Sequence, residues 1–335
     1  MSTTTDPRET LARDGWVFFR EFFPAELVAR AYREVEALYQ ADMAARTERG
    51  VADAHFDGPG GHSVLTAPTH LMIDLYGKSP ALDEMFERVL TDPAVAPVLT
   101  ALAGPGIKLR GYNCTRLTGA HDPGPRRGAA PNPHDWHRDS QGEFGFGLFL
   151  SDFAEPNQGT TALMRGSHVF PYCPRWNCLF GEPYHRGLPL FLALNPMSRL
   201  LARRVRPLAM GAYGRAGDFY LFLNDTWHGR EPNLAGHQGL RIMVGAFPAD
   251  MPYPDEVRPL TDEVLARLPP ALRAAAPQPR PTDVPTAPKP LLEAMWQAQQ
   301  APHPALFGLA HAERQVADAL SGVARRLRDG LLGRG

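Results

Sequence analysis

The segment HDWHRD, residues 134–139, places two histidines and two aspartates within six positions. If this segment is a β-strand, side chains alternate between its faces, so His137 and Asp139 share one face, with Asp135 beside them. An imidazole and a carboxylate two residues apart can occupy neighbouring positions around one metal ion. A surface ion pair explains the two residues equally well, so a metal site requires a third ligand.

A candidate third ligand lies further along the chain, where the apolar segment 219–223 ends in a polar turn and His228 follows. Two histidines and one carboxylate form the facial triad of non-haem Fe(II) oxygenases, which leaves positions for water and substrate. Zinc hydrolysis with the same ligands is the chemical alternative. His237 is the alternative to His228, and Asp135 is the alternative to Asp139. We prefer His228 because it follows an apolar strand and is flanked by Trp227 and by the motif GREPN, residues 229–233.

Arg241 stands within the apolar segment GLRIMVGAF, residues 239–247. A lone arginine there would be costly to bury without an anionic partner. A guanidinium forms a bidentate pair with a carboxylate, and 2-oxoglutarate carries one at the end remote from its metal-chelating keto acid. The pattern indicates a 2-oxoglutarate anchor. The alternatives are an arginine that faces solvent or pairs with an internal acid.

The elements that must position these residues are short strands. Between about residues 105 and 250, apolar or alternating runs are interrupted by Gly, Pro, Asn and Asp, which is typical of an antiparallel sandwich or barrel. Upstream, a short strand and then an amphipathic helix are expected within 11–40, and 41–100 is expected to be mainly helical with a break at 56–63. The Gly- and Pro-rich segment 121–133 reads as a long loop, and 170–209 as an insertion.

Four motifs, in this order, make a combination that is recognisable: residues 14–38 (DGWVFFREFFPAELVARAYREVEAL), 136–139 (WHRD), 157–168 (NQGTTALMRGSH) and 217–233 (GDFYLFLNDTWHGREPN). Together with Arg241 they resemble the phytanoyl-CoA dioxygenase family of Fe(II)/2-oxoglutarate-dependent oxygenases. The resemblance covers about residues 11–250. It implies a mainly β fold with flanking helices around a double-stranded β-helix, the cupin-like jelly roll.

The resemblance also implies an activity. It assigns His137, Asp139 and His228 to catalysis and to Fe(II), and Arg241 to 2-oxoglutarate, with O2 as the oxidant. The expected reaction is hydroxylation of an aliphatic carbon of a small molecule, with release of succinate and CO2. Halogenases of this superfamily replace the carboxylate ligand with a small residue, so Asp139 favours hydroxylation. A desaturase or cyclase of the same family, and a non-catalytic jelly-roll binding module, are the alternatives.

Several arginines depart from the family pattern or lie near the expected mouth of the site. Arg138 replaces a glutamine that is common between the two proximal ligands, and Arg230 replaces a small or hydroxylated residue. Arg126 and Arg127 lie on the expected loop. We therefore expect these four arginines to contact substrate, which favours an anionic or specialised small metabolite.

Composition and charge exclude several other classes. The net charge of −1 gives no electrostatic reason to expect nucleic acid, and no stretch reaches the roughly 18 apolar residues of a membrane span. The three cysteines form no CxxC pair, which argues against a disulfide framework and favours buried thiols in a reducing compartment. A cytoplasmic enzyme is expected.

The chain divides into three regions on composition. Residues 1–250 form the expected oxygenase domain, 251–290 a Pro-rich extended tether and 291–335 an amphipathic helical tail. In the tail, apolar residues recur on one helical face between 316 and 331. This face predicts docking on the domain or on a second subunit, so a homodimer through the tail is a further expectation.

Overall fold

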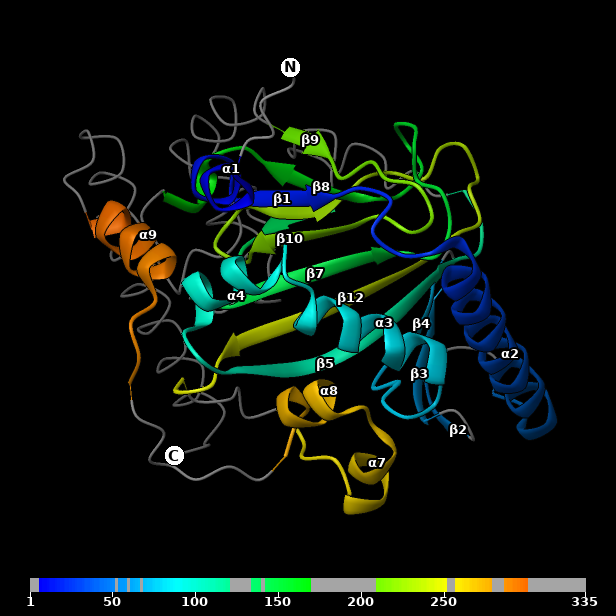
Figure 1. Ribbon diagram of the computed structural model, residues 1–335. Coiled ribbons are helices and arrows are strands. Elements are labelled where there is room, and N and C mark those ends of the chain that lie inside the picture. The colour runs from blue at the N-terminus through cyan, green and yellow to red at the C-terminus, as the bar shows by residue number, and fades with distance from the viewer. Residues whose placement is uncertain are drawn as a thin grey trace, which may run out of the picture.

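The computed structural model describes residues 6–51, 54–58, 61–66, 69–120, 134–139, 142–169, 209–251, 257–278 and 286–300. The predicted loop 121–133, nearly all of the predicted insertion and the tail after residue 300 lie outside these ranges. In the described ranges two antiparallel sheets form the centre of the molecule, and helices cover the outer face of the larger one (Figure 1).

The strands of the two sheets interleave along the chain. The larger sheet has the order β1 (Trp16–Phe19), β10 (Phe219–Leu223), β7 (Phe144–Phe149), β12 (Leu240–Pro248), β5 (Ile107–Leu117), β4 (Thr69–Met72), β3 (Gly61–Thr66), β2 (Ala54–Gly58). The smaller sheet has the order β6 (His134–His137), β11 (His228–Arg230), β8 (Thr161–Met164), β9 (Ala209–Gly211). From β5 to β12 the chain alternates between sheets except at β8 and β9, which are both in the smaller one. This is the topology of a double-stranded β-helix, so the predicted fold class is confirmed.

The described helices are α1 (Pro7–Asp14), α2 (Ala25–Arg49), α3 (Pro80–Thr91), α4 (Ala96–Ala103), the 3-10 turn η1 (Ser167–Val169), α7 (Asp262–Arg267), α8 (Pro270–Ala275) and α9 (Pro290–Gln300). Three of them, α1, α3 and α7, begin at a side chain that caps the first turn. In α3, for example, the Ser79 side chain accepts a hydrogen bond from the Leu82 amide. Leu82, Phe86 and Val89, at helical spacing, are buried in the main core against the sheet. No helix in the described ranges is long and apolar enough to cross a membrane.

Aromatic rings fill the interior between the two sheets. Two glycines of β7, Gly145 and Gly147, lie directly opposite Phe222 and Tyr220 of β10. A Cβ atom added to Gly147 would lie 2.1 Å from Cζ of Tyr220, and one added to Gly145 would lie 2.4 Å from Cε1 of Phe222. The missing side chains therefore let both rings lie over the β7 backbone, which explains the alternation FGFGLF.

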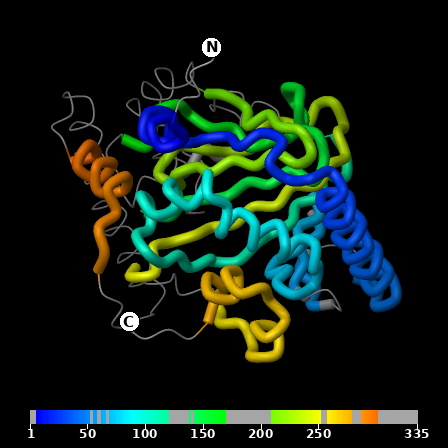
Figure 2. The backbone as a smooth tube through the Cα atoms, viewed as in Figure 1, coloured from blue at the N-terminus to red at the C-terminus, as the bar shows by residue number. Residues whose placement is uncertain are grey.

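The sequence predicts that residues 41–100 are mainly helical, and this is wrong for residues 54–58, 61–66 and 69–72. These residues form the strands β2, β3 and β4. Within the Gly- and Pro-rich break, Gly58 of β2 pairs with Gly61 of β3, and β4 extends the larger sheet by pairing with β5. Pairing with the β5 edge outweighs local helix propensity, which is a weak determinant. Figure 2 shows this segment beside α2.

A buried ionic network ties these added strands to α2. The Asp42 carboxylate of α2 accepts hydrogen bonds from Arg46 Nε (2.8 Å), from Ser63 Oγ of β3 (2.8 Å) and from His70 Nε2 of β4 (2.7 Å). All four side chains are buried. Because every partner is hydrogen-bonded, burial of the charges is compensated and β4 is held in place.

The C-terminal part of the described chain packs on the core. Instead of an extended tether over 251–290, the structure has α7 and α8 there, and Leu268 and Leu272 are buried in the main core. Proline permits this because Pro270 occupies the first turn of α8, where no intrahelical donor is lost. The Glu87 carboxylate of α3 accepts the amides of Ala271 and Leu272, which caps the helix.

Helix α9 contacts η1, which follows β8, and the turn that precedes β11. Gln299 Nε2 donates to the His168 carbonyl (2.7 Å) and to Asp225 Oδ1 (2.9 Å). His168 in turn donates from Nε2 to the Ala12 carbonyl (2.9 Å), which ties η1 to α1. Burial lowers the pKa of His168 to about 4, so the ring stays neutral near pH 7.

The described cysteine, Cys114, lies in the main core. Burial raises the pKa of its thiol to about 12, which keeps it protonated and unreactive. This agrees with the expectation of a buried thiol. Cys173 and Cys178 lie outside the described residues.

Substitution of Leu272 tests whether α8 is part of the folded core. We expect Leu272→Ala to lower the free energy of unfolding by about 2–5 kcal/mol, because it removes a fully buried side chain. Urea unfolding measures the change. The control is Leu234→Ala, at a side chain that is 51% exposed. Equal small effects of both substitutions would show that α8 does not contribute to the core.

Candidate functional site

Asp139 and His228 meet at one end of the smaller sheet. His228 Nε2 lies 3.4 Å from Asp139 Oδ2. Asp139 lies two residues after the end of β6, and its amide donates to the Asn224 carbonyl (3.3 Å), while His228 begins β11. The link to Asn224 ties the end of β6 to the turn that precedes β11. Residues far apart in sequence are thus brought to a single point.

The His228 ring is held in one orientation by its second nitrogen. Nδ1 lies 2.8 Å from the Thr226 carbonyl, which can only accept, so Nδ1 carries a proton. The ring also packs edge-on against Phe222, with centroids 5.2 Å apart. Nε2 is left as the nitrogen that faces Asp139. Two lone-pair groups at this distance require a proton or a cation between them.

The electrostatics of His228 reflect this requirement. Burial disfavours its charged form, but the Asp139 carboxylate and the Thr226 carbonyl outweigh burial and leave the pKa of the imidazole above its ordinary value. Metal ions bind the neutral imidazole and compete with that proton. The pair therefore has the chemistry of a cation site.

The backbone of His137 is paired with that of His228 across β6 and β11. Directly paired residues of antiparallel strands share a face of the sheet, so positions 137 and 228 lie on the same face. The side chain of His137 is outside what the structure describes, as are those of His134, Asp135 and Trp136. Among the described side chains no group of three possible metal ligands is found, and the role of His137 stays a prediction.

Two further residues, Asn224 and Glu143, lie close to Asp139, and the sequence did not single them out. Asn224 Nδ2 donates to Asp139 Oδ2 (3.0 Å) and orients the carboxylate. Glu143 is buried nearby, and burial together with the negative charge of Asp139 raises its pKa to about 7, against the opposing effect of Arg110. The only sequence signal for Asn224 was its place in the polar turn before His228.

Arg241 lies inside the barrel on β12. Its side chain is buried, and Nη1 donates to Thr161 Oγ1 of β8 (3.1 Å), which also lies 2.9 Å from the Tyr220 hydroxyl. Its Nε is buried and has no hydrogen-bond partner among the described residues. Burial lowers the pKa of the guanidinium. A buried donor without a partner indicates a place for an acceptor, and the carboxylate predicted at this residue fits it.

Arg230 lies at the same end of the interior as Arg241. Its Nη1 donates to Thr69 Oγ1 of β4 (2.9 Å), and its Nε is buried without a partner among the described residues. Burial and the positive charge of Arg241 lower the pKa of Arg230 to about 9. Arg230 is thus partly buried beside Arg241.

The other predicted substrate arginines do not join this pair in the described structure. Arg138 is buried, donates to the Ser167 carbonyl (2.5 Å) and lies over the Trp227 ring (5.0 Å to the centroid). These contacts hold the Arg138 guanidinium within the core, and its role as a substrate contact stays a prediction. Arg126 and Arg127 lie outside the described residues.

The alternative histidine, His237, has a different environment. Its ring packs against Phe153, with centroids 4.8 Å apart, and its amide donates to the Asn233 side chain. It belongs to the turn before β12. Among the described histidines, His228 is the one within ion-pair distance of Asp139.

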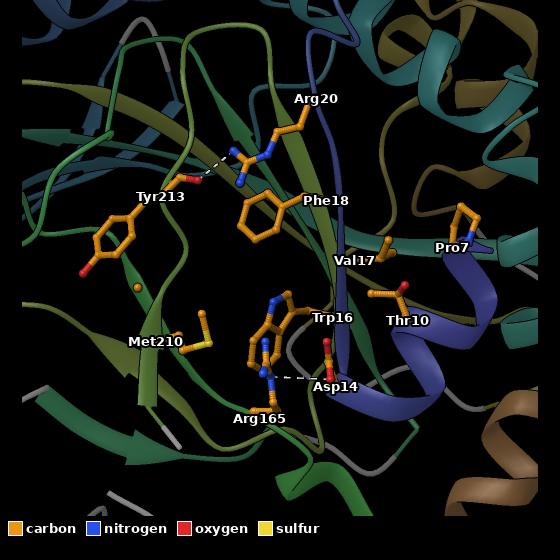
Figure 3. Close-up of a pocket in the computed structure, with 11 residues that line it drawn as sticks. Pro7, Thr10, Asp14, Trp16, Val17, Phe18, Arg20, Arg165, Met210 and Tyr213 are labelled. Carbon is orange, nitrogen blue, oxygen red and sulfur yellow. Dashed lines mark hydrogen bonds and ion pairs between the residues drawn. The ribbon is translucent and has the colours of Figure 1, made fainter. Parts of the chain in front are cut away.

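A separate cavity of about 440 Å³ lies between α1, β1 and β9 (Figure 3). Neither Asp139, His228, Arg230 nor Arg241 lines it. Its charged side chains already have protein partners: Arg20 donates to the Tyr213 carbonyl and to Asp218, and Arg165 pairs with Asp14. These contacts leave no charge that calls for a ligand.

Comparison with known proteins finds no family model that matches the chain and no curated protein that matches it. Among solved structures, it is similar to the non-haem 2-oxoglutarate-dependent epimerase SnoN from nogalamycin biosynthesis (18% identity, 82% of this chain and 95% of that one, TM-score 0.46). It is also similar to HygX from Streptomyces hygroscopicus with nickel and 2-oxoglutarate bound (18% identity, 79% of this chain and 94% of that one, TM-score 0.46). A third similar structure is AviO1 from Streptomyces viridochromogenes Tue57 (18% identity, 76% of this chain and 100% of that one, TM-score 0.46). Likenesses this distant carry no inference about activity.

Removal of the Asn224 side-chain amide tests whether the site around Asp139 and His228 binds a metal ion. We expect Asn224→Ala to weaken Fe(II) binding by about 10–100-fold, since the Asp139 carboxylate loses the group that orients it. Anaerobic calorimetric titration with Fe(II) measures the affinity. Gln278→Ala removes an amide near the end of α8 and should leave Fe(II) affinity unchanged. If Asn224→Ala bound Fe(II) like the wild type, Asn224 would have no orienting role.

Proposed function

We propose that this chain is a non-haem Fe(II)- and 2-oxoglutarate-dependent dioxygenase that hydroxylates a small molecule. The observation that carries the proposal is the interior of the double-stranded β-helix, where a carboxylate and the Nε2 of an imidazole meet at one end and a buried, partly unsatisfied guanidinium lies at the other. The first arrangement suits a divalent cation, and the second suits a carboxylate.

In this proposal His137, Asp139 and His228 hold the iron. Asn224 and the Thr226 carbonyl keep Asp139 and His228 in the orientation that binding requires. When bound, Fe(II) supplies the activation of O2 that is coupled to oxidative decarboxylation of 2-oxoglutarate to succinate and CO2. The residues themselves position the reactants and keep them apart from bulk water.

Arg241 is proposed to bind the distal carboxylate of 2-oxoglutarate. Its position on β12, next to Thr161 and Tyr220, places donors around one point of the interior. Because the site is buried, a guanidinium–carboxylate pair gains strength from the low local dielectric. The co-substrate would then have a fixed direction, with its keto-acid end toward Asp139 and His228.

The reaction type and the substrate follow from weaker observations. Asp139 occupies the carboxylate position, which favours hydroxylation, while desaturation or ring formation would depend on how the substrate lies. An anionic or specialised small metabolite remains our proposed substrate class. The finer resemblance, to the phytanoyl-CoA dioxygenase family, also stays a prediction.

The test is anaerobic addition of Fe(II) and 2-oxoglutarate to the full chain, followed by visible absorption. We expect the weak charge-transfer band of the iron-chelated keto acid in the wild type, and its loss in His137→Ala. His55→Ala, at an exposed histidine of β2, is the matched control and should keep the band.

The outcomes separate the alternatives. A wild type that binds metal without the band would favour a hydrolase site with the same ligands. A wild type that binds no metal would favour a non-catalytic jelly-roll module. Either result would refute the dioxygenase proposal.

A further inference from the structure

Thr161 of the smaller sheet neighbours two arginines, the buried Arg241 and the partly buried Arg230. Arg230 of β11 is paired directly with Thr161 of β8, so both lie on the same face. Thr161 Oγ1 accepts a hydrogen bond from Arg241 Nη1, which comes from the opposite sheet (3.1 Å). Arg230 is also held by Thr69 of β4, through its own Nη1 (2.9 Å). The two cations therefore reach the interior from facing sheets.

The described protein groups do not neutralise this pair. No described carboxylate forms an ion pair with Arg230 or Arg241, and the Nε of each is buried without a hydrogen-bond partner in the described ranges. Glu231 is the nearby acid that favours the charge of Arg241, but its carboxylate accepts from the Tyr213 hydroxyl (2.5 Å). Two like charges held together away from water are unfavourable without a bound anion.

We infer that Arg230 and Arg241 form a two-guanidinium site for a single carboxylate, so that Arg230 is a second anchor for the distal carboxylate of a 2-oxo dicarboxylic acid. The inference rests on the proposed function, because it concerns the same co-substrate. It changes the role expected for Arg230 from a substrate contact to a co-substrate contact.

The spacing along β11 favours the co-substrate over another anion. His228 and Arg230 are two residues apart on one face, roughly 6.5 Å along the strand. A five-carbon dicarboxylate that chelates a metal beside His228 can span about this distance to its far carboxylate. The hydroxyl groups of Thr69 and Thr161 hold the guanidinium groups on either side of that point.

The test compares two keto acids that differ only at this end. Anaerobic Fe(II) protein is titrated with 2-oxoglutarate and with 2-oxobutanoate, which lacks the distal carboxylate, and the charge-transfer band reports binding. In Arg230→Met we expect the dissociation constant of 2-oxoglutarate to rise by about tenfold or more, as expected for loss of a charge-assisted hydrogen bond. The constant for 2-oxobutanoate should stay nearly unchanged.

Two further variants define the comparison. Arg241→Met is the reference variant. It should weaken the binding of 2-oxoglutarate and leave the binding of 2-oxobutanoate nearly unchanged. Arg165→Met removes one positive charge from an arginine outside the site and should change neither constant. If Arg230→Met does not fold, Arg230→Lys replaces it, and the same selective but smaller loss is expected because lysine lacks the bidentate geometry.

Each result has a distinct meaning. An unchanged constant for 2-oxoglutarate in Arg230→Met would overturn the inference and leave the proposed function standing. An equal rise in the dissociation constants of both keto acids would also overturn the inference, since Arg230 would then act only on the shape of the site. Absence of the band in the wild type would refute the proposed function itself.

Discussion

The three-residue strand β11 is hydrogen-bonded on both sides, to β6 and to β8, and the geometry of the interior depends on this double pairing. An unpaired segment of this length could not hold its side chains in fixed directions. Between two neighbours, its first and last residues face the same way, so an imidazole and a guanidinium are presented to the interior from one short segment. The irregular register against β6 falls between these two residues.

The interior is electrically divided along its length. At one end Asp139 and Glu143 place acidic groups beside His228, and at the other Arg230 and Arg241 place two cations. The aromatic rings of Phe222 and Tyr220 line β10 between the ends. The partial burial of both charge clusters limits screening by water, so each end favours a ligand of opposite sign. A metal-bound dicarboxylate would satisfy both ends at once.

The sequence allowed prediction where a residue able to bind a ligand stands beside or within an apolar run of strand length. His228 follows the apolar strand β10 and Arg241 lies within the apolar strand β12, and the expected β framework followed from the same short runs. The sequence was less informative where long-range pairing decides. The strands at 54–72 depend on the edge of β5 and on Asp42, and the helices at 262–275 depend on Glu87 and on an apolar face that α3 supplies. Thr69, Thr161 and Asn224 gain their meaning only from partners distant in sequence.

The bond from Gln299 of α9 to Asp225 links the end of the described chain to the turn between Asn224 and Thr226. That turn supplies the amide that orients Asp139 and the carbonyl that orients the His228 ring. A boundary drawn at residue 250, where composition changes, would retain every residue expected to touch ligand. It would nevertheless remove the hydrogen bond from Gln299 that supports this turn, so the folded unit around the turn extends beyond the jelly roll to α9.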